Sequence, residues 1–259
     1  MAFKVSTLFS ASLAILLSTV SVVEAFAPPV GSTVVRGRGS SCPSPSASSL
    51  FMSDGAPVSL NPSETALVLI EFQNEFTTEG GALYGAVEEC IKKNNVIENA
   101  SKLMNVMRDA GCSVLHVPIA FKEGHNEIGA SAGILAGIAE GKTFTKDTWS
   151  SEFHPSMAPQ PADLVVEGKK GLCGFFSTNL DFLLRQRGIK NVVLAGFLTN
   201  CCIESTMRTA YEHGYDVYTL KDASAATSVA AHEAAFEHNF GMFSTVSTCE
   251  EVAAAVGGA

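Results

Sequence analysis

Glu71, Lys169 and Cys202 are three residue types that together can perform nucleophilic acyl chemistry, and each follows a short apolar run. A thiol at the start of a helix is favoured as thiolate by the helix dipole and the free N–H groups there. A nearby lysine lowers the thiol pKa further, and a carboxylate can take the proton and pass it on. Backbone N–H groups in the turn before the helix can stabilise an oxyanion. An acid, a lysine and a thiol therefore predict a nucleophilic site, provided that the fold brings them together.

The seven cysteines also allow a simpler interpretation, because most free cysteines are buried packing residues. The sequence has no CxxC pair, and its cysteines are too sparse for a disulfide framework. Adjacent Cys201 and Cys202 cannot both point the same way on a turn. Composition and position leave open whether either is a nucleophile. Packing is the expected role of Cys90, Cys112 and Cys249, and Cys173 is expected in a buried loop.

Six short apolar runs recur at long intervals, at 66–70, 113–117, 163–166, 191–195, 216–220 and 242–246. They are nearly continuous rather than alternating, which is typical of strands covered on both faces. Helical spacing occurs between them, near 96–107, 180–187, 204–213 and 228–238. This alternation predicts an α/β fold, a three-layer αβα sandwich around a mostly parallel, six-stranded, Rossmann-like sheet.

Ligands of such open sheets bind at the carboxyl ends of the strands. The residues just beyond the predicted strands are Glu71, Pro118, Lys169, Phe197 and Asp222. The Gly-rich, weakly patterned residues 122–149 are expected to help cover a site there.

Composition indicates one well-buried domain, because 46% of the 259 residues are hydrophobic. The formal net charge is −9, and no block of Lys and Arg is present to neutralise phosphates. Nucleic acid is therefore excluded as an expected partner, and a small-molecule substrate is favoured.

The N-terminus has the composition of a targeting sequence. Lys4 precedes an apolar stretch at 5–23 that ends at Ala25, which predicts a cleaved signal peptide over 1–25; a transmembrane anchor is the alternative. Residues 26–60 follow as a Ser- and Pro-rich transit peptide or linker, and 61–259 as the folded domain. The stretch Glu-Ala-Phe-Ala-Pro at 24–28 resembles the plastid-targeting motif of algae with secondary plastids. Plastid import is therefore expected, with secretion as the alternative and no membrane association after the presequence is removed.

Three motifs occur in the order and at the strand ends found in one family. They are Glu-Phe-Gln-Asn-Glu-Phe at 71–76, a lysine six residues before Phe175, and Gly-x-x-Thr-x-x-Cys-Ile at 196–203. Over about residues 64 to 252 the chain resembles the isochorismatase-like cysteine hydrolases. The family spacing selects Lys169 rather than Lys170, and Cys202 rather than Cys201.

The resemblance implies a cofactor-free hydrolase that cleaves a C–N bond of a small amide, ureide or carbamoyl compound through a thioester. It also implies a cis peptide between Phe197 and Leu198, and an oxyanion hole formed by the N–H groups of Leu198 and Cys202. Assembly as a homo-dimer or homo-tetramer is a further implication. Candidates for the pocket wall are Phe76, Phe121, Phe197 and Thr199.

Position 71 departs from the family pattern. It is glutamate here, whereas the acid that ends the family's first strand is normally aspartate. The extra methylene moves the carboxylate by roughly 1.5 Å if nothing else adjusts. Either the Lys169 loop has adapted to the longer side chain, or activity is weakened. Two alternatives to the amide hydrolase also remain open: a vinyl ether hydrolase of the isochorismatase type, which needs no cysteine, and a degenerate protein with a binding or scaffold role.

No metal site is expected. His116 lies within a predicted strand and is interpreted as a packed core residue. His232 and His238 are six residues apart, on different faces of the predicted helix.

Overall fold

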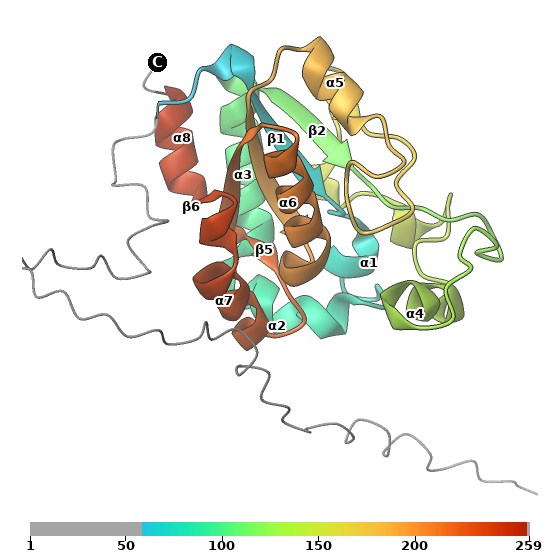
Figure 1. Cartoon of the computed structure of the whole chain (residues 1–259). Helices are drawn as coiled ribbons and strands as arrows, with labels where there is room; N and C mark the ends of the chain where they lie inside the picture. Colours follow the sequence, from blue (N-terminus) through green and yellow to red (C-terminus); the bar gives the residue numbers. More distant parts are fainter. Residues whose placement is uncertain (1–58, 258–259) are drawn as a thin grey trace, which may run out of the picture. The chain divides into compact units, whose positions relative to one another are not determined.

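The computed structural model describes residues 59–257, which form a parallel sheet between two layers of helices (Figure 1). The strand order is β3-β2-β1-β4-β5-β6, and every neighbouring pair is parallel. The predicted fold class is therefore confirmed. The predicted signal peptide and nearly all of the predicted transit segment lie outside the described residues. The strands are β1 (Thr65–Ile70), β2 (Ser113–Val117), β3 (Leu164–Val165), β4 (Asn191–Phe197), β5 (Asp216–Ala225) and β6 (Thr245–Ser247).

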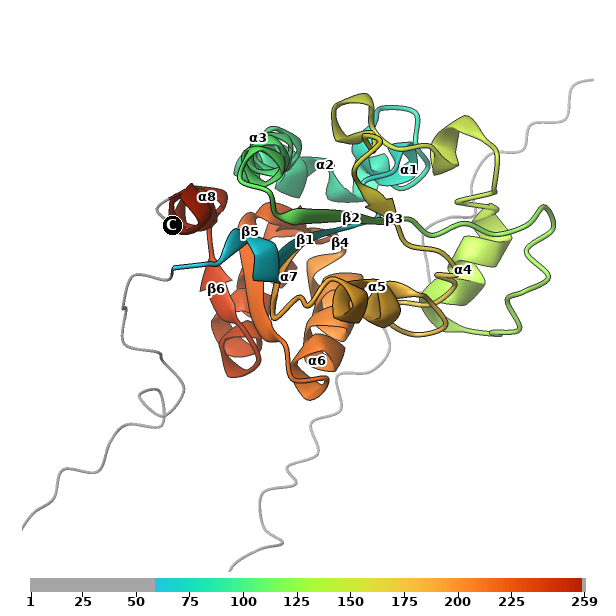
Figure 2. The same ribbon diagram turned by 90° about the horizontal axis from the view of Figure 1, so that it is seen from above.

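Seen from above, the helices separate into two layers on either side of the sheet (Figure 2). Helices α2 (Tyr84–Asn94), α3 (Val96–Asp109) and α8 (Cys249–Gly257) pack on one face. Helices α5 (Leu180–Gln186), α6 (Glu204–Glu212) and α7 (Val229–His238) pack on the other. Helices α1 (Asn74–Thr77) and α4 (Gly133–Gly141) lie beyond the end of the sheet to which the β2 arrow points (Figure 1). Of the helices in residues 59–257, none has both the length and the apolar character needed to cross a membrane.

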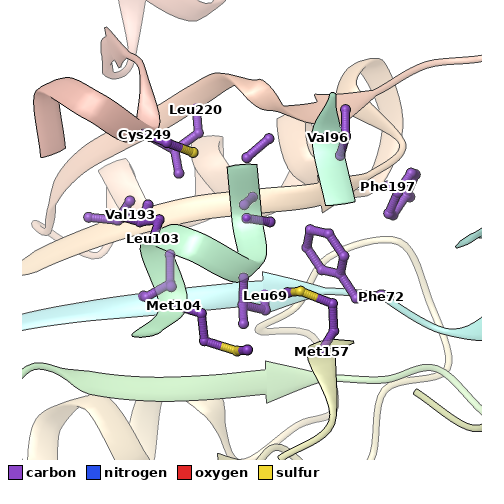
Figure 3. Packing of buried hydrophobic residues seen from close by; sticks show 14 of the residues in the cluster. Leu69, Phe72, Val96, Leu103, Met104, Met157, Val193, Phe197, Leu220 and Cys249 are labelled. Carbon is purple, nitrogen blue, oxygen red and sulfur yellow. The ribbon is translucent and has the colours of Figure 1, made fainter. Parts of the chain in front are cut away.

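Strand β1 shows why the apolar runs do not alternate. All six of its residues are buried: Leu67 and Leu69 belong to the core under α3, whereas Val68 and Ile70 belong to the core under α5 and α6. Figure 3 shows Leu69 of β1 together with Leu103 and Met104 of α3, which belong to one buried cluster. Both faces of β1 are therefore covered, so its residues do not alternate between apolar and polar.

The structure corrects the sixth predicted strand, which was placed at 242–246. Strand β6 is Thr245–Ser247, and a single 3-10 turn, Phe240–Met242, precedes it. Phe240 is fully buried, and its ring lies 4.5 Å from that of Phe236 on α7. The apolar residues near 242 therefore close the helix layer rather than extend the sheet. The four helices expected from spacing are present as α3, α5, α6 and α7.

Leu60 belongs to the fold, although the sequence places it at the end of the linker. It is buried in the core, and its backbone N–H donates to the carbonyl of Ala255 in α8 at 3.2 Å. The first described residues are thus anchored against the last helix.

Glycine at position 196 is required where β4 passes β1. Its φ is +130°, and a Cβ built there would lie 2.0 Å from the Ile70 carbonyl oxygen. The register between β4 and β5 also shifts between Leu194 and Gly196. Because Ile70 directly precedes Glu71, this close approach sets the position of the strand ends at the site.

Replacing Gly196 with Ala is expected to lower the free energy of unfolding by about 3 kcal/mol, because the methyl group meets backbone that cannot move away. Guanidinium denaturation followed by circular dichroism would measure the change. Gly85→Ala is the matched control: Gly85 lies in α2 with nothing within 4 Å of an added Cβ. That change should stabilise the protein by about 0.5–1 kcal/mol. A Gly196→Ala protein as stable as the parent would contradict the assigned close approach.

Candidate active site

The three residues selected from the sequence meet at the carboxyl end of the sheet. Glu71 follows β1, Lys169 follows β3, and Cys202 lies in the turn after β4. The Lys169 Nζ lies 2.5 Å from Glu71 Oε1 and 3.9 Å from Cys202 Sγ. All three side chains are buried. An acid, an ammonium and a thiol from separate strand ends are therefore in contact, as nucleophilic catalysis requires.

Backbone geometry fixes the acid and the lysine. The Glu71 N–H donates to the Val117 carbonyl at 3.1 Å, which continues the β1–β2 pairing by one residue. Glu71 itself has a left-handed φ of 57°. Gly168, directly before the lysine, has φ +96°, and a Cβ there would lie 2.4 Å from the Ser177 carbonyl oxygen. Only glycine allows the 167–179 loop to close this tightly.

The structure separates the two adjacent lysines. Lys169 Nζ donates to the Gly171 carbonyl at 2.6 Å in addition to Glu71. Lys170 Nζ instead donates to the Ala120 carbonyl and lies 3.4 Å from Glu127, on the outside of the loop. Lys169, the lysine selected by the family spacing, is thus the one that contacts the thiol.

The turn that carries Cys202 is a short π-helix, Thr199–Ile203, which leads directly into α6. The N–H groups of Cys201 and Ile203 both donate to the Leu198 carbonyl at 3.1 Å. The Phe197–Leu198 peptide is cis, as the resemblance implies. The N–H groups of Leu198 and Cys202 belong to this turn, and an oxyanion hole formed by them stays a prediction.

Neighbouring helices hold this turn. The Thr206 hydroxyl donates to the Cys202 carbonyl at 2.7 Å and accepts the Gly174 N–H at 2.8 Å. From α7, His232 Nε2 donates to the Lys221 carbonyl at 3.0 Å, so Nδ1 accepts the Thr199 hydroxyl at 2.8 Å. Burial lowers the His232 pKa, which keeps the ring neutral. His232 is therefore a structural residue that fixes the turn.

Electrostatics at the thiol differ from the sequence expectation. The adjacent Cys201 side chain, burial and the Glu71 carboxylate all raise the pKa of Cys202, and the lysine opposes them only in part. Burial lowers the pKa of Lys169, but the Glu71 carboxylate and the thiol outweigh burial and raise it. These surroundings thus favour the protonated thiol and the charged ammonium at this end of the cavity.

The thiol opens on a cavity of about 320 Å³. Its wall is mostly apolar and is lined by Glu71, Phe76, Leu83, Ala86, Ile119, Ile134, Gly137, Ile138, Thr143, Phe144, Leu172, Leu198, Cys202 and Thr227. Several of these residues come from 122–149, which confirms that this segment covers the site. The sequence identified the covering segment from its glycines, but its weak patterning did not show which of its side chains face inward.

Of the four residues expected in the pocket wall, Phe76 alone lines the cavity. Phe197 is fully buried behind it, with the two rings stacked at 5.3 Å. Phe121 is also fully buried, and its N–H donates to the Phe144 carbonyl at 2.9 Å. Thr199 turns its hydroxyl to His232. These three support the wall from behind, because their side chains are fully buried and do not line the cavity.

Glu75 has a role that sequence reasoning missed. Its side chain is buried, with one oxygen accepting the Ala82 N–H at 2.7 Å and the other the Phe144 N–H at 3.0 Å. One carboxylate thus ties two separate walls of the cavity together. The signal was present, because the acid belongs to the 71–76 motif, but its partners lie far away in the sequence.

The other strand-end and histidine candidates are structural. His116 is fully buried, with Nε2 3.2 Å from Asp163, which confirms the packing interpretation. Asp222 lies within β5 and accepts the N–H of Cys249 at the start of α8. Among residues 59–257, no three His, Cys, Asp or Glu side chains converge as metal ligands.

Comparison with known proteins agrees with this arrangement. The sequence model of the isochorismatase domain matches residues 65–251. The chain is similar to the ureidoacrylate amidohydrolase RutB of Agrobacterium fabrum, at 33% identity over 65% of this chain and 78% of the relative. The same enzyme of Stutzerimonas stutzeri is 32% identical over 77% and 87% of the two chains.

Solved structures share the fold. A cysteine hydrolase from Pseudomonas syringae pv. phaseolicola superposes with a TM-score of 0.71 at 25% identity, covering 80% of this chain and 99% of the other. An N-carbamoylsarcosine amidase from Thermoplasma acidophilum gives a TM-score of 0.58 at 27% identity, covering 72% and 97%.

Glu71→Asp tests whether the site is built for glutamate. Because the Glu71 carboxylate already contacts Lys169, shortening the side chain withdraws it by roughly 1.5 Å. We expect kcat on a small amide to fall about 10- to 100-fold. Aspartate tolerates the left-handed backbone at least as well as glutamate, so thermal stability should change little. A gain in kcat with aspartate would show instead that glutamate is a defect.

Proposed function

The chain belongs to the isochorismatase family, and we propose that within it this hydrolase uses Cys202 to cleave the C–N bond of a small amide, ureide or carbamoyl compound. The observation that carries the proposal is the contact of one buried ammonium, Lys169, with both the Glu71 carboxylate and the Cys202 thiol at the cavity wall. Relatives named as a ureidoacrylate amidohydrolase and an N-carbamoylsarcosine amidase support the C–N bond as the target.

The first half of the reaction forms a thioester. Glu71 accepts the Cys202 proton while Lys169 stabilises the growing negative charge, and the sulfur attacks the carbonyl carbon. The oxyanion is held by the N–H groups of Leu198 and Cys202. The tetrahedral species collapses as the C–N bond breaks, and the nitrogen leaves as ammonia or an amine after Glu71 returns the proton.

The second half restores the enzyme. Water enters the position of the departed nitrogen, Glu71 accepts one of its protons, and the hydroxide attacks the thioester carbon. Collapse breaks the C–S bond, and the thiolate regains its proton from Glu71. Every proton transfer uses the same carboxylate, so the mechanism needs no metal or organic cofactor.

Cys202→Ala is expected to lower kcat/KM for amide hydrolysis by at least about 1,000-fold, because the nucleophile is lost. Ammonia release from a panel of small amides and ureides measures this. Cys201→Ala is the matched control on the neighbouring residue, which does not line the cavity, and should retain activity within about 10-fold. Full activity in Cys202→Ala would exclude a thioester and favour the vinyl ether hydrolase of the isochorismatase type. No activity in the parent protein on any substrate of the panel would favour a binding role.

We propose that residues 1–25 and 26–60 act in series to deliver the enzyme to a secondary plastid. The apolar stretch after Lys4, the acid-free segment after Ala25 and the motif at 24–28 support this proposal. A fluorescent protein carrying residues 1–60 should reach the plastid of such an alga, whereas residues 26–60 alone should leave it in the cytosol. Release of the 1–60 fusion into the medium would favour secretion instead. Assembly as a dimer or tetramer remains a prediction of the family resemblance.

A further inference from the structure

We propose that the substrate is an uncharged amide or carbamoyl compound with a short apolar body, and that compounds with a carboxylate on that body are rejected. This inference rests on the proposed function, which assigns the C–N bond, and it concerns the rest of the molecule. It comes from the chemistry of the cavity wall next to the thiol.

The cavity wall lacks a positive charge. Of its fourteen lining residues only Glu71 and Cys202 ionise, and no lysine, arginine or histidine is among them. The remaining side chains of the wall are aliphatic, aromatic or threonine, apart from one glycine. A carboxylate bound there would lose its water without gaining a cationic partner, which is a costly exchange.

The two lysines that follow β3, Lys169 and Lys170, already have partners. Lys169 Nζ is shared between Glu71 Oε1 and the Gly171 carbonyl, so its charge is neutralised. Lys170 Nζ donates to the Ala120 carbonyl and lies over the Phe121 ring, 5.3 Å from its centroid. Neither ammonium is available to pair with a second carboxylate.

The polar groups that remain on the wall are neutral hydroxyls. Thr143 lines the cavity, is 5% exposed, and its hydroxyl has no partner within the described chain. A buried hydroxyl without a partner is unusual, and because a hydroxyl is neutral it supplies no cation to pair with a substrate carboxylate. The wall thus offers hydrogen bonds to a neutral group and apolar contact to the rest.

The size of the cavity limits the apolar body. A volume of about 320 Å³ is at the lower end of the range for small-molecule sites, roughly 300–1,000 Å³. Ile138 and Phe144 of the covering segment and Phe76 of α1 enclose it. Ile134 lines the cavity and is 42% exposed, which places it at the mouth.

Matched pairs of amides test the inference on the full folded protein. Butanamide, hexanamide and octanamide are compared with succinamate, adipamate and suberamate, in which a carboxylate replaces the terminal methyl group. For at least one pair, kcat/KM measured by ammonia release is expected to favour the neutral amide by about 100-fold or more.

A charge added at the mouth provides the second arm. Ile134→Lys supplies a cation, and Ile134→Gln is the matched control, polar but uncharged. The ratio of kcat/KM for the neutral amide to kcat/KM for the charged amide should be about 10-fold or more lower in Ile134→Lys than in Ile134→Gln. This comparison separates charge from the loss of apolar contact.

The outcomes distinguish the two levels of the proposal. Equal or better hydrolysis of the charged amides, dependent on Cys202, would overturn the inference and leave the proposed function intact. Failure of all six amides would count against the proposed function, and the inference would fall with it. A kcat/KM that strongly favours the neutral amides would support both the proposed function and the inference, provided that Ile134→Lys reduces this preference and Ile134→Gln does not.

Discussion

The charge of Lys169 has to be neutralised inside the protein, because its side chain is almost completely buried. An unpaired ammonium in such a place would be strongly destabilising, and among residues 59–257 Glu71 is the carboxylate in contact with it. The two residues come from strands that are separated by β2 in the sheet. Their contact therefore holds only if three strand ends are in register, and the site and the fold depend on the same ion pair.

The surrounding backbone keeps that register. Gly168 and Gly196 adopt positive φ where a side chain would meet a carbonyl oxygen, one beside the lysine and one beside the acid. On the side of the thiol, Thr206 and His232 hold the π-helical turn through hydrogen bonds from two helices. Burial helps to raise the thiol pKa, since few waters remain to stabilise a thiolate, whereas the Glu71 carboxylate and the thiol raise the ammonium pKa against the effect of burial.

The covering segment makes much of the cavity wall apolar. Residues 122–149 contribute apolar side chains to one side of the cavity, and the Glu75 carboxylate joins them to the opposite side through Phe144 and Ala82. A wall of this kind recognises shape and neutral hydrogen bonds rather than charge. The ionisable side chains of the wall, Glu71 and Cys202, lie at one end of the cavity, and the rest of the wall fits the apolar body of the substrate.

The sequence alone determined the parallel sheet, the order of the site motifs and the choice of Lys169 and Cys202. Apolar periodicity and motif spacing are local properties, so they can be read along the chain. The sequence did not determine the bounds of the last strand, the side chains that line the cavity or the pKa of the Cys202 thiol. Phe121 and Phe197 were expected in the wall and lie behind it, whereas Ile138 and Phe144 face inward. Which side of an aromatic residue meets a cavity, and how much water reaches a thiol, depend on contacts between segments far apart in sequence. Only tertiary packing decides them.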